Sequence, residues 1–311
     1  MALHQASGRW RLGLMLAIIT ALCWASLPVA LKVTLEELDA ITLTWFRFLV
    51  ATIVMLVWLS WRGGLSVFKA LDKKRWRHLA AAALLLIGNY VFYLLGVQYT
   101  TPANAQLLIQ LAPLLMALGG IFIFRELYQF GQWCGLAIIA CGLALFFSDQ
   151  LKGTALGTQA YLIGSASVIF AAVVWAGYAL IQKQLLLRLS SQTILFFIYA
   201  VASLLLLPFS HPQKILALDQ KHAWTLAYCA INTLIAYGAF AEALVHWQAS
   251  RVSAILAVTP LLCLACVAIV HSISPDTVAS EHVTTLGYVG AVLVVIGSSL
   301  SSLLGQKKAE Q

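Results

Sequence analysis

The stretch YTTPANAQLLIQLAP, residues 99–113, has a counterpart in HWQASRVSAILAVTP, residues 246–260. Both stretches are mostly apolar, and both end in a proline, Pro113 in the first and Pro260 in the second. The two prolines lie 147 residues apart. Similarity at a fixed separation indicates an internal repeat, and a repeat that spans half the chain determines the whole fold.

Other residues recur at nearly the same separation. Tyr90 and Tyr237 also lie 147 residues apart. At the front of each half, Trp24 and Lys32 recur as Trp175 and Lys183. Towards the end of each half, a glutamate is followed by two glycines at equal spacing: Glu126, Gly135 and Gly142, then Glu281, Gly290 and Gly297. We therefore predict two related halves, residues 1–150 and 151–311.

The composition places both halves in a membrane. Of 311 residues, 62% are hydrophobic and 10% are charged, whereas a soluble globular chain carries about a quarter charged residues. Ten apolar runs approach the roughly 20 residues that a spanning helix needs. They cover residues 12–31, 41–61, 78–98, 104–124, 132–148, 160–182, 192–209, 223–246, 252–271 and 284–304. The prediction is an all-α membrane protein of ten transmembrane helices, five in each half.

The number of helices in a half determines how the two halves are related. Because five is odd, the second half must be inverted relative to the first, an arrangement typical of secondary transporters. With the N-terminus inside, the alternating runs place fourteen of the 19 Lys and Arg residues on the inner side. The positive-inside rule therefore predicts a multi-pass protein of the bacterial inner membrane with both termini in the cytoplasm.

Several motifs carry a resemblance to a known family. They are Trp24 through Lys32, the segment WFRFLVA at 45–51, Ala105 through Pro113, Glu126 with Gly135, and the second-half counterparts. This pattern resembles the EamA family of the drug/metabolite transporter superfamily. The resemblance implies export of amino acids, metabolites or drugs from the cytoplasm, through a cavity lined mainly by helices 1, 3, 4, 6, 8 and 9. The pattern departs from an exact repeat at Arg47, because the second half has Ile198 and Tyr199 there.

The function favoured is that of a secondary-active transporter that exports amino acids or related small metabolites by alternating access. Efflux of cationic drugs is an alternative, and a membrane-embedded enzyme is a rival from another class. The sequence has no HExxH, GxSxG, P-loop or dinucleotide-binding pattern, which argues against an enzyme and a cofactor. The chain has no nucleotide-binding domain, so a gradient would drive transport, with protons as a candidate coupling ion.

The expected partners are a small-molecule substrate and the lipid bilayer. The net charge of +8 does not predict nucleic-acid binding, because the basic residues lie at segment ends without interleaved aromatic residues. No metal site is expected, since the CxxC pair Cys263 and Cys266 stands alone within an apolar run. A monomer and a homodimer are both compatible with the sequence.

Glu242 and His246 are ionisable residues within the eighth apolar run. They are four residues apart and therefore share one face of a helix. Ionisable residues within a membrane are functional candidates, and this pair could bind a substrate amine or relay a proton. In the alternative interpretation, a buried Glu242 pairs with His246 or Arg251 and only fixes two helices together.

Arg47 lies about two turns into the second run. Its planar guanidinium could hold a substrate carboxylate. Alternatively, its long side chain extends outward to the acidic residues that precede the helix, Glu36, Glu37 and Asp39. We favour the second, structural role for Arg47.

Two glutamines and two prolines complete the polar and backbone candidates. Gln106 and Gln110 share a helix face and are candidates for substrate binding, although membrane glutamines often only bridge helices. Pro113 and Pro260 each remove one backbone hydrogen bond in mid-helix. They are candidate hinges, and a static kink is the alternative.

Aromatic side chains, with one amide, form the largest group of candidate substrate contacts. The residues are Trp24, Asn89, Tyr90, Tyr93, Trp175, Tyr178 and Tyr237. Tryptophan and tyrosine are ordinary at a membrane interface, but Trp24 and Trp175 fall deeper and could stack on a flat or cationic substrate. Chance placement explains part of this set, because 11% of the chain is aromatic.

Overall fold

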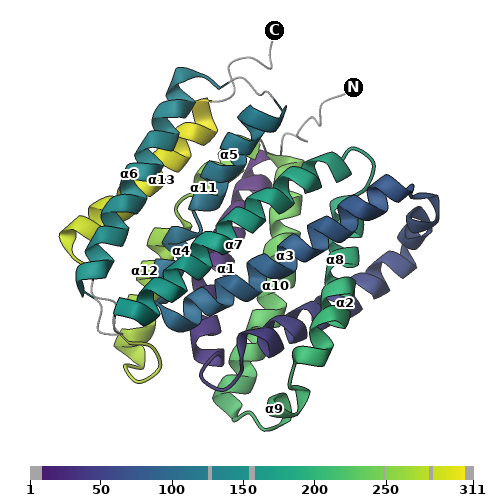
Figure 1. The fold of residues 1–311 in the computed structure, drawn as a ribbon, viewed down its shortest axis with the longest axis horizontal. Helices are drawn as coiled ribbons and strands as arrows, with labels where there is room; N and C mark the ends of the chain where they lie inside the picture. The colour runs from purple at the N-terminus through teal and green to yellow at the C-terminus, as the bar shows by residue number, and fades with distance from the viewer. Residues whose placement is uncertain (1–8, 125–127, 154–157, 248, 280–282, 305–311) are drawn as a thin grey trace.

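The computed structural model describes residues 9–124, 128–153, 158–247, 249–279 and 283–304, and the described elements are all helices (Figure 1). Two residues of the predicted repeat, Glu126 and Glu281, lie outside these ranges. The first turn of α1 and the last turn of α13 lie at the same end of the molecule.

The helices follow the predicted runs closely. The first half contains α1 (Trp10–Thr34), α2 (Ala40–Trp61), the 3-10 helix η1 (Gly64–Ala70), α3 (Lys73–Tyr99), α4 (Pro102–Leu108), α5 (Leu111–Phe124) and α6 (Phe130–Gly153). The second half contains α7 (Thr158–Leu185), α8 (Ser191–Leu206), η2 (Leu207–Phe209), α9 (Pro212–Leu216), α10 (Gln220–His246), α11 (Ala249–Leu256), α12 (Thr259–Ile273) and α13 (Thr285–Leu303).

The described residues form nine helical segments that are long and apolar enough to cross a membrane. Two of these nine combine a pair of shorter helices, α4 with α5 and α11 with α12. The apolar part of α13, Thr285–Ser301, is a shorter tenth segment. The predicted fold of ten transmembrane helices is confirmed.

Two helices that the apolar runs predict to be continuous are broken at equivalent places. The fourth predicted helix divides at residues 109–110, and the ninth divides at residues 257–258. Each break comes shortly before a proline, which lacks the N–H that would continue the helix. Before Pro260, the Thr259 hydroxyl donates to the Leu256 carbonyl at 2.5 Å. The hinge role of both prolines stays a prediction.

Side-chain caps set several helix starts. Asp72 accepts a hydrogen bond from the Arg75 N–H at 2.9 Å, so α3 begins at Lys73, five residues before the predicted apolar run. Such a cap satisfies a backbone donor that has no partner within the helix. The basic residues at 73–77 therefore belong to the first turns of α3, and not to a loop.

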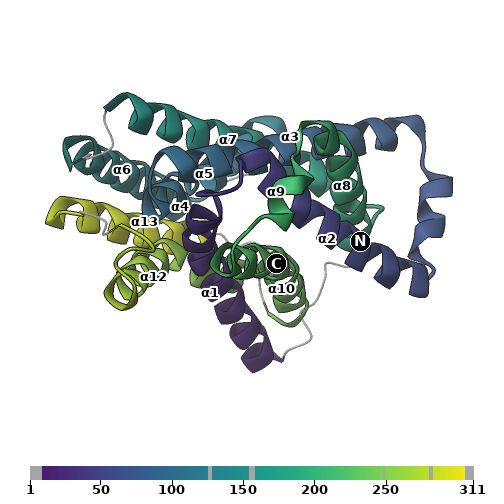
Figure 2. The same cartoon turned by 90° about the horizontal axis from the view of Figure 1, so that it is seen from below.

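Contacts between helices repeat in the same way as the sequence. By the repeat, α1 corresponds to α7, α2 to α8, α3 to α10 and α6 to α13. The helix α1 packs along α10 as α7 packs along α3, and α1 contacts α12 as α7 contacts α5. The equivalent helices α2 and α8 are in contact with each other, and so are the equivalent helices α6 and α13 (Figures 1 and 2). The two halves are thus related by a pseudo-two-fold axis, on which α2–α8 and α6–α13 lie.

Glycines bring the backbones of α6 and α13 together. A Cβ atom added to Gly142 would lie 2.6 Å from the Gly290 carbonyl oxygen, and one added to Gly290 would lie 2.7 Å from the Gly142 oxygen. The pair Gly135 and Gly297 has the same reciprocal contacts. Small residues let membrane helices approach closely, which explains the repeated glycine spacing in the sequence.

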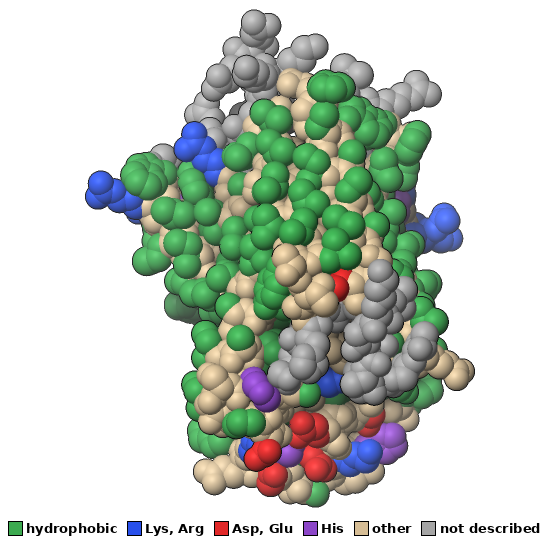
Figure 3. Space-filling view, turned by 90° about the vertical axis from the view of Figure 1, so that its left-hand side faces the viewer, with side chains coloured by type: hydrophobic (Ala, Val, Ile, Leu, Met, Phe, Trp, Pro, Cys, Tyr) green, Lys and Arg blue, Asp and Glu red, His purple; other side chains and the backbone are tan. Residues whose placement is uncertain are grey.

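The surface agrees with a lipid environment along the helices. Figure 3 shows one side of the molecule, where apolar side chains cover most of the upper face and acidic and histidine side chains gather at the lower end. Many large hydrophobic side chains are exposed, including Trp61, Phe122 and Leu204. A membrane would remove these side chains from water.

Candidate functional site between the two halves

Tyr90 and Tyr237, which correspond to each other in the repeat, are in contact across the two halves. Tyr90 lies on α3 and Tyr237 on α10, and the Tyr90 hydroxyl donates a hydrogen bond to the Tyr237 hydroxyl at 3.3 Å. The Trp24 ring from α1 packs edge-on against Tyr237, with ring centroids 5.9 Å apart. Contact between equivalent residues places this centre on the pseudo-two-fold axis.

Two further tyrosines from the second half surround this pair. Tyr178 on α7 and Tyr199 on α8 are buried. Each lies close enough to Tyr90 and Tyr237 for their hydroxyl groups to interact electrostatically. The Tyr199 ring stacks on Phe48 at 5.3 Å. We call Tyr90, Tyr178, Tyr199 and Tyr237 the tyrosine cluster.

Arg47 points into the tyrosine cluster. Its side chain comes from α2, and only 2% of the residue is exposed. Its Nε and Nη2 atoms donate to the Thr233 hydroxyl at 3.1 and 3.0 Å, and the guanidinium lies 5.0 Å from the centre of the Tyr90 ring. The predicted outward path to Glu36, Glu37 and Asp39 is therefore wrong. Asp39 binds instead to Thr42 and His211 at the start of α2.

The two glutamines of the fourth predicted helix have different surroundings. Gln106 is buried on α4, and its Oε1 accepts a hydrogen bond from the Tyr93 hydroxyl at 2.9 Å. Gln110 lies in the break between α4 and α5 and is half-buried. In the part of the chain that the structure describes, no hydrogen bond to the Gln110 side chain is formed. The break, and not a continuous helix face, positions this amide.

Asn89 and Trp175 lie at the α3–α7 side of the cluster. The Asn89 Nδ2 donates to the Ala171 carbonyl at 2.9 Å, so this amide bridges α3 and α7. Trp175 is half-buried and packs against the apolar residues around the tyrosine cluster. Substrate contact by either residue stays a prediction.

Glu242 and His246 form the predicted pair within α10. The His246 Nε2 and Glu242 Oε1 atoms are 3.1 Å apart. The Glu242 side chain is 58% exposed, so the expectation of a buried acid is wrong. Ala243 next to it is fully buried, which turns Glu242 away from the protein interior. Among the described residues, Glu242 makes no ion pair with Arg251.

Lys32, to which the sequence pattern assigned no role, has a defined position. Its Nζ donates to the carbonyl oxygens of Val97, Gln98 and Thr100 at 2.9, 2.8 and 2.7 Å. These carbonyls end α3, where a cation is favoured by the helix dipole. The recurrence of a lysine at position 183 was the signal available in the sequence.

Asn232 was also missed. It lies on α10 and is buried, and its Nδ2 donates to the Cys23 carbonyl of α1 at 2.9 Å. Its Oδ1 has no hydrogen-bond partner among the described residues. A single amide in an apolar run offers too weak a pattern for a sequence-based prediction.

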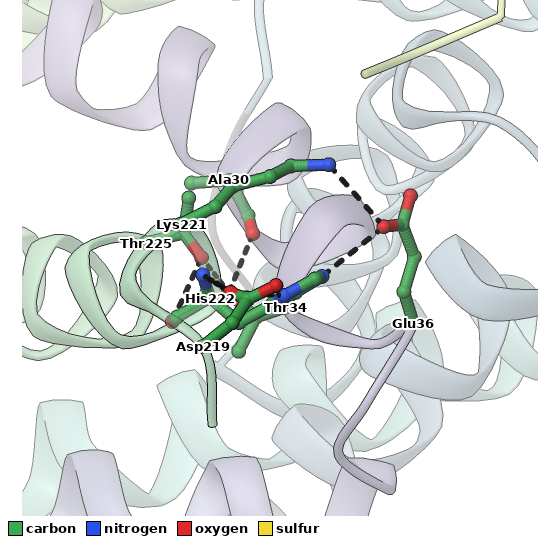
Figure 4. A network of polar contacts seen from close by, with 7 residues as sticks. All are labelled: Ala30, Thr34, Glu36, Asp219, Lys221, His222 and Thr225. Atoms are coloured by element: carbon green, nitrogen blue, oxygen red, sulfur yellow. Dashed lines mark hydrogen bonds and ion pairs between the residues drawn. The ribbon is translucent and has the colours of Figure 1, made fainter. Parts of the chain in front are cut away.

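A charged network ties the two halves together at the acidic end (Figure 4). His222, in the first turn of α10, contacts Asp219 through Nδ1 at 2.7 Å and Glu36 through Nε2 at 3.2 Å. Lys221 reaches the same Glu36 oxygen at 3.5 Å. Thr34 of α1 donates to Thr225 of α10 at 3.1 Å beneath these charges. The network therefore links the end of α1 and the residues after it to the start of α10.

Two carboxyls at this end have lowered pKa values. The backbone N–H of His222, helped by its ring, holds the pKa of the Asp219 carboxyl below its ordinary value. Burial raises the pKa of Asp39, but hydrogen bonds from the N–H and hydroxyl of Thr42 outweigh it and leave that pKa below its ordinary value. Both carboxylates cap the helices that follow them.

The model of the EamA-like transporter family matches residues 11–148 and, separately, residues 162–303. The chain belongs to the EamA-like transporter family. The EamA chain is 36% identical over 293 residues to the "Uncharacterized inner membrane transporter YhbE" of Escherichia coli (strain K12), across 94% of this chain and 91% of that protein. It is therefore a multi-pass transporter of the inner membrane.

Two more distant similarities extend the comparison. This EamA chain is 23% identical over 296 residues to the "Probable amino-acid metabolite efflux pump" of Salmonella typhimurium, across 91% of this chain and 92% of that protein. A solved crystal structure with 18% identity superposes with a TM-score of 0.65, across 97% of this chain and 98% of that one. At this identity the solved structure supports the fold alone.

Proposed function

We propose that this protein is a secondary-active transporter that exports amino acids or related small metabolites by alternating access. The observation that supports it most is the meeting of Tyr90 and Tyr237 on the pseudo-two-fold axis, beside Trp24 and the buried Arg47. Secondary transporters with inverted repeats bind their substrates near the midplane between the repeats. Polar and aromatic groups from both halves meet at this interface.

The architecture suggests how the two access states arise. Since the halves are inverted copies, each half can adopt the conformation of the other, and the exchange opens the centre first to one side and then to the other. The broken helices, α4–α5 and α11–α12, occupy equivalent places in the halves. Irregular backbone is tolerated at membrane depth where protein buries it or it lines a cavity.

The proposed orientation in the membrane is supported by the distribution of charge, and the proposed direction of transport is supported by a relative. The excess of Lys and Arg on the side of the N-terminus supports cytoplasmic termini. The name of the Salmonella relative, "Probable amino-acid metabolite efflux pump", supports export of the same class of compound by this chain. Lipid and a small-molecule substrate are the only partners that this function needs, and monomer and homodimer both suffice.

Efflux of cationic compounds is the second candidate. The exposed Glu242 carboxylate beside His246 favours it, because an acid within a membrane helix can bind a cation. The same pair could relay protons, which would couple export to the proton gradient. These two roles predict different effects of removing the charge.

Counterflow uptake in proteoliposomes tests the proposal. A panel of labelled amino acids and cationic drugs is offered to wild-type protein and Glu242→Gln, with and without a pH gradient. Wild type is expected to take up an amino acid. If Glu242 relays protons, Glu242→Gln removes the effect of the gradient and retains counterflow. Uptake of cationic drugs alone, abolished in Glu242→Gln, would establish the second candidate, and uptake of nothing by folded protein would contradict both.

A further inference from the structure

Arg47 is a buried cation that has only neutral partners among the described residues. Its two hydrogen bonds go to one hydroxyl, that of Thr233, and its face lies on the Tyr90 ring. No Asp or Glu in the described ranges forms an ion pair with it. A guanidinium has five N–H donors, so most of its capacity for hydrogen bonds is unused by Thr233.

An ionised group in this position is unfavourable without a counter-charge. Burying a charge is expensive unless an opposite charge and hydrogen bonds compensate it. A hydroxyl dipole and a ring face offset part of this, but neither supplies a negative charge. A protein that only needed a helix contact here could use an uncharged side chain.

The second half shows that the fold itself does not require the charge. By the repeat, Arg47 and Phe48 of α2 correspond to Ile198 and Tyr199 of α8, and Ile198 is fully buried. Phe48 and Tyr199 stack on each other across the axis. Positions 47 and 198 are therefore equivalent in the two halves, and position 198 is occupied by an isoleucine. The cation at position 47 makes the centre asymmetric.

Three other polar side chains of the first half are already engaged. Gln106 accepts from Tyr93, Asn89 bridges to α7, and Lys32 binds the carbonyls that end α3. Arg47 alone among these four combines a positive charge, burial and unused donors. Its position beside Tyr90 and Tyr237 puts these donors where the two halves meet.

We propose that Arg47, held by Thr233, binds the carboxylate of the transported substrate at the tyrosine cluster. This inference rests on the proposed function and specifies its substrate class as compounds with a free carboxylate. The guanidinium fork matches a carboxylate in a two-point contact. The rings of Tyr90, Tyr237 and Trp24 would pack against the apolar part of the same molecule. Tyr90 and Tyr237 are hydrogen-bonded to each other in the described conformation, and we expect them to separate when the substrate binds between them.

The test compares three probes that share a benzyl group but differ in the head group, with two further carboxylates of different structure. L-Phenylalanine, phenylalaninamide and phenethylamine, with L-threonine and benzoate, are offered in counterflow to wild type, Arg47→Gln, Arg47→Lys and Thr233→Val. Thr44→Val is the matched control, because Thr44 is a buried hydroxyl on α2 that bonds only to the Ala40 carbonyl. In parallel, the melting temperature of each purified variant is measured with benzoate, phosphate or chloride at equal ionic strength.

The expected result is uptake of carboxylate probes and not of the amide or the amine. Arg47→Gln should reduce it by roughly 10- to 100-fold, as expected for lost charge-assisted hydrogen bonds. Arg47→Lys and Thr233→Val should retain part of the activity, and Thr44→Val all of it. Benzoate should raise the melting temperature of wild type but not of Arg47→Gln, and phosphate or chloride should have no such effect.

Different outcomes separate this inference from the proposed function. Uptake of amines only, or full carboxylate uptake by Arg47→Gln, would overturn the role of Arg47 and leave transport standing. No uptake of any probe, with a benzoate effect that requires Arg47, would support the carboxylate site while contradicting transport of this panel. No uptake and no benzoate effect would overturn the inference. Should Arg47→Gln fail to fold, Thr233→Val and Arg47→Lys give the same comparison.

Discussion

Single residues show where the sequence is informative and where it is not. The separation of 147 residues relates Tyr90 to Tyr237, but it does not predict that the two hydroxyls touch. The predicted direction of Arg47 is wrong, because hydropathy places a residue along a helix and says nothing about its partner on another helix. The partner is Thr233, and a single threonine within an apolar run does not indicate a contact with a particular residue on another helix.

Lys32 provides a residue-scale prediction about stability. Replacing it with methionine keeps the length of the side chain and removes the charged donor from three carbonyls at the end of α3. We expect the free energy of unfolding to fall by about 1.5–3 kcal/mol, the range for hydrogen bonds that involve a charged group. Thermal unfolding in detergent measures this. Lys214→Met, at an exposed position, is the control, and equal effects of the two changes would contradict the capping role.

The lowered pKa values of Asp39 and Asp219 predict a dependence of stability on pH. Each folded-state pKa lies below the ordinary value of 3.8, so the unfolded chain takes up protons first as the pH falls. The stability from these carboxylates is therefore fully present above the ordinary pKa and is lost as the pH drops through the folded values. Melting temperatures from about pH 6 down to about pH 3 should decline at the acidic end.

A double variant, Asp39→Asn with Asp219→Asn, is the control for this pH dependence. Asparagine still caps a helix but does not titrate. Its melting temperature should therefore decline less steeply at acidic pH than that of wild type. An identical decline in both proteins would assign the pH dependence to other groups.

At the scale of elements, the sequence predicts the number of membrane-spanning segments well, but it does not predict which of them are broken into two helices. Ten apolar runs give the correct count of spans because lipid demands a minimum apolar length. The breaks at 109–110 and 257–258 are not predicted, since a single glutamine, Gln110, does not interrupt an apolar run, and Ala257 and Val258 are as apolar as their neighbours. The prolines mark the neighbourhood of each break but not its position.

The α6–α13 contact gives an element-scale prediction. Gly142→Ala would place a Cβ 2.6 Å from the Gly290 carbonyl oxygen, and Gly290→Ala would do the reverse. Overpacking of this kind lowers stability by about 1–3 kcal/mol. Thermal unfolding measures the loss against Gly238→Ala, where no atom beyond the local backbone of α10 lies within 4 Å of the added Cβ. Unchanged stability in Gly142→Ala would mean that the two helices are not in close contact.

For the whole molecule, the repeat determines most of the architecture. An odd number of helices per half predicts inversion, and the contacts of α1 with α10 and of α7 with α3 have the symmetry that inversion requires. The exact division at residue 150 and the cytoplasmic position of the termini stay predictions. The candidate site is only partly predictable, because side chains from α2, α3, α8 and α10 meet there through tertiary packing.

The central claim is that the tyrosine cluster faces each side of the membrane in turn. A single cysteine at position 237 (Tyr237→Cys), in a background without the six native cysteines, can be treated with an impermeant thiol reagent from outside or inside proteoliposomes. The claim predicts modification from either side, slowed by a transported substrate. Modification from one side only, or none from either, under conditions that modify an exposed control cysteine, would contradict alternating access at this centre.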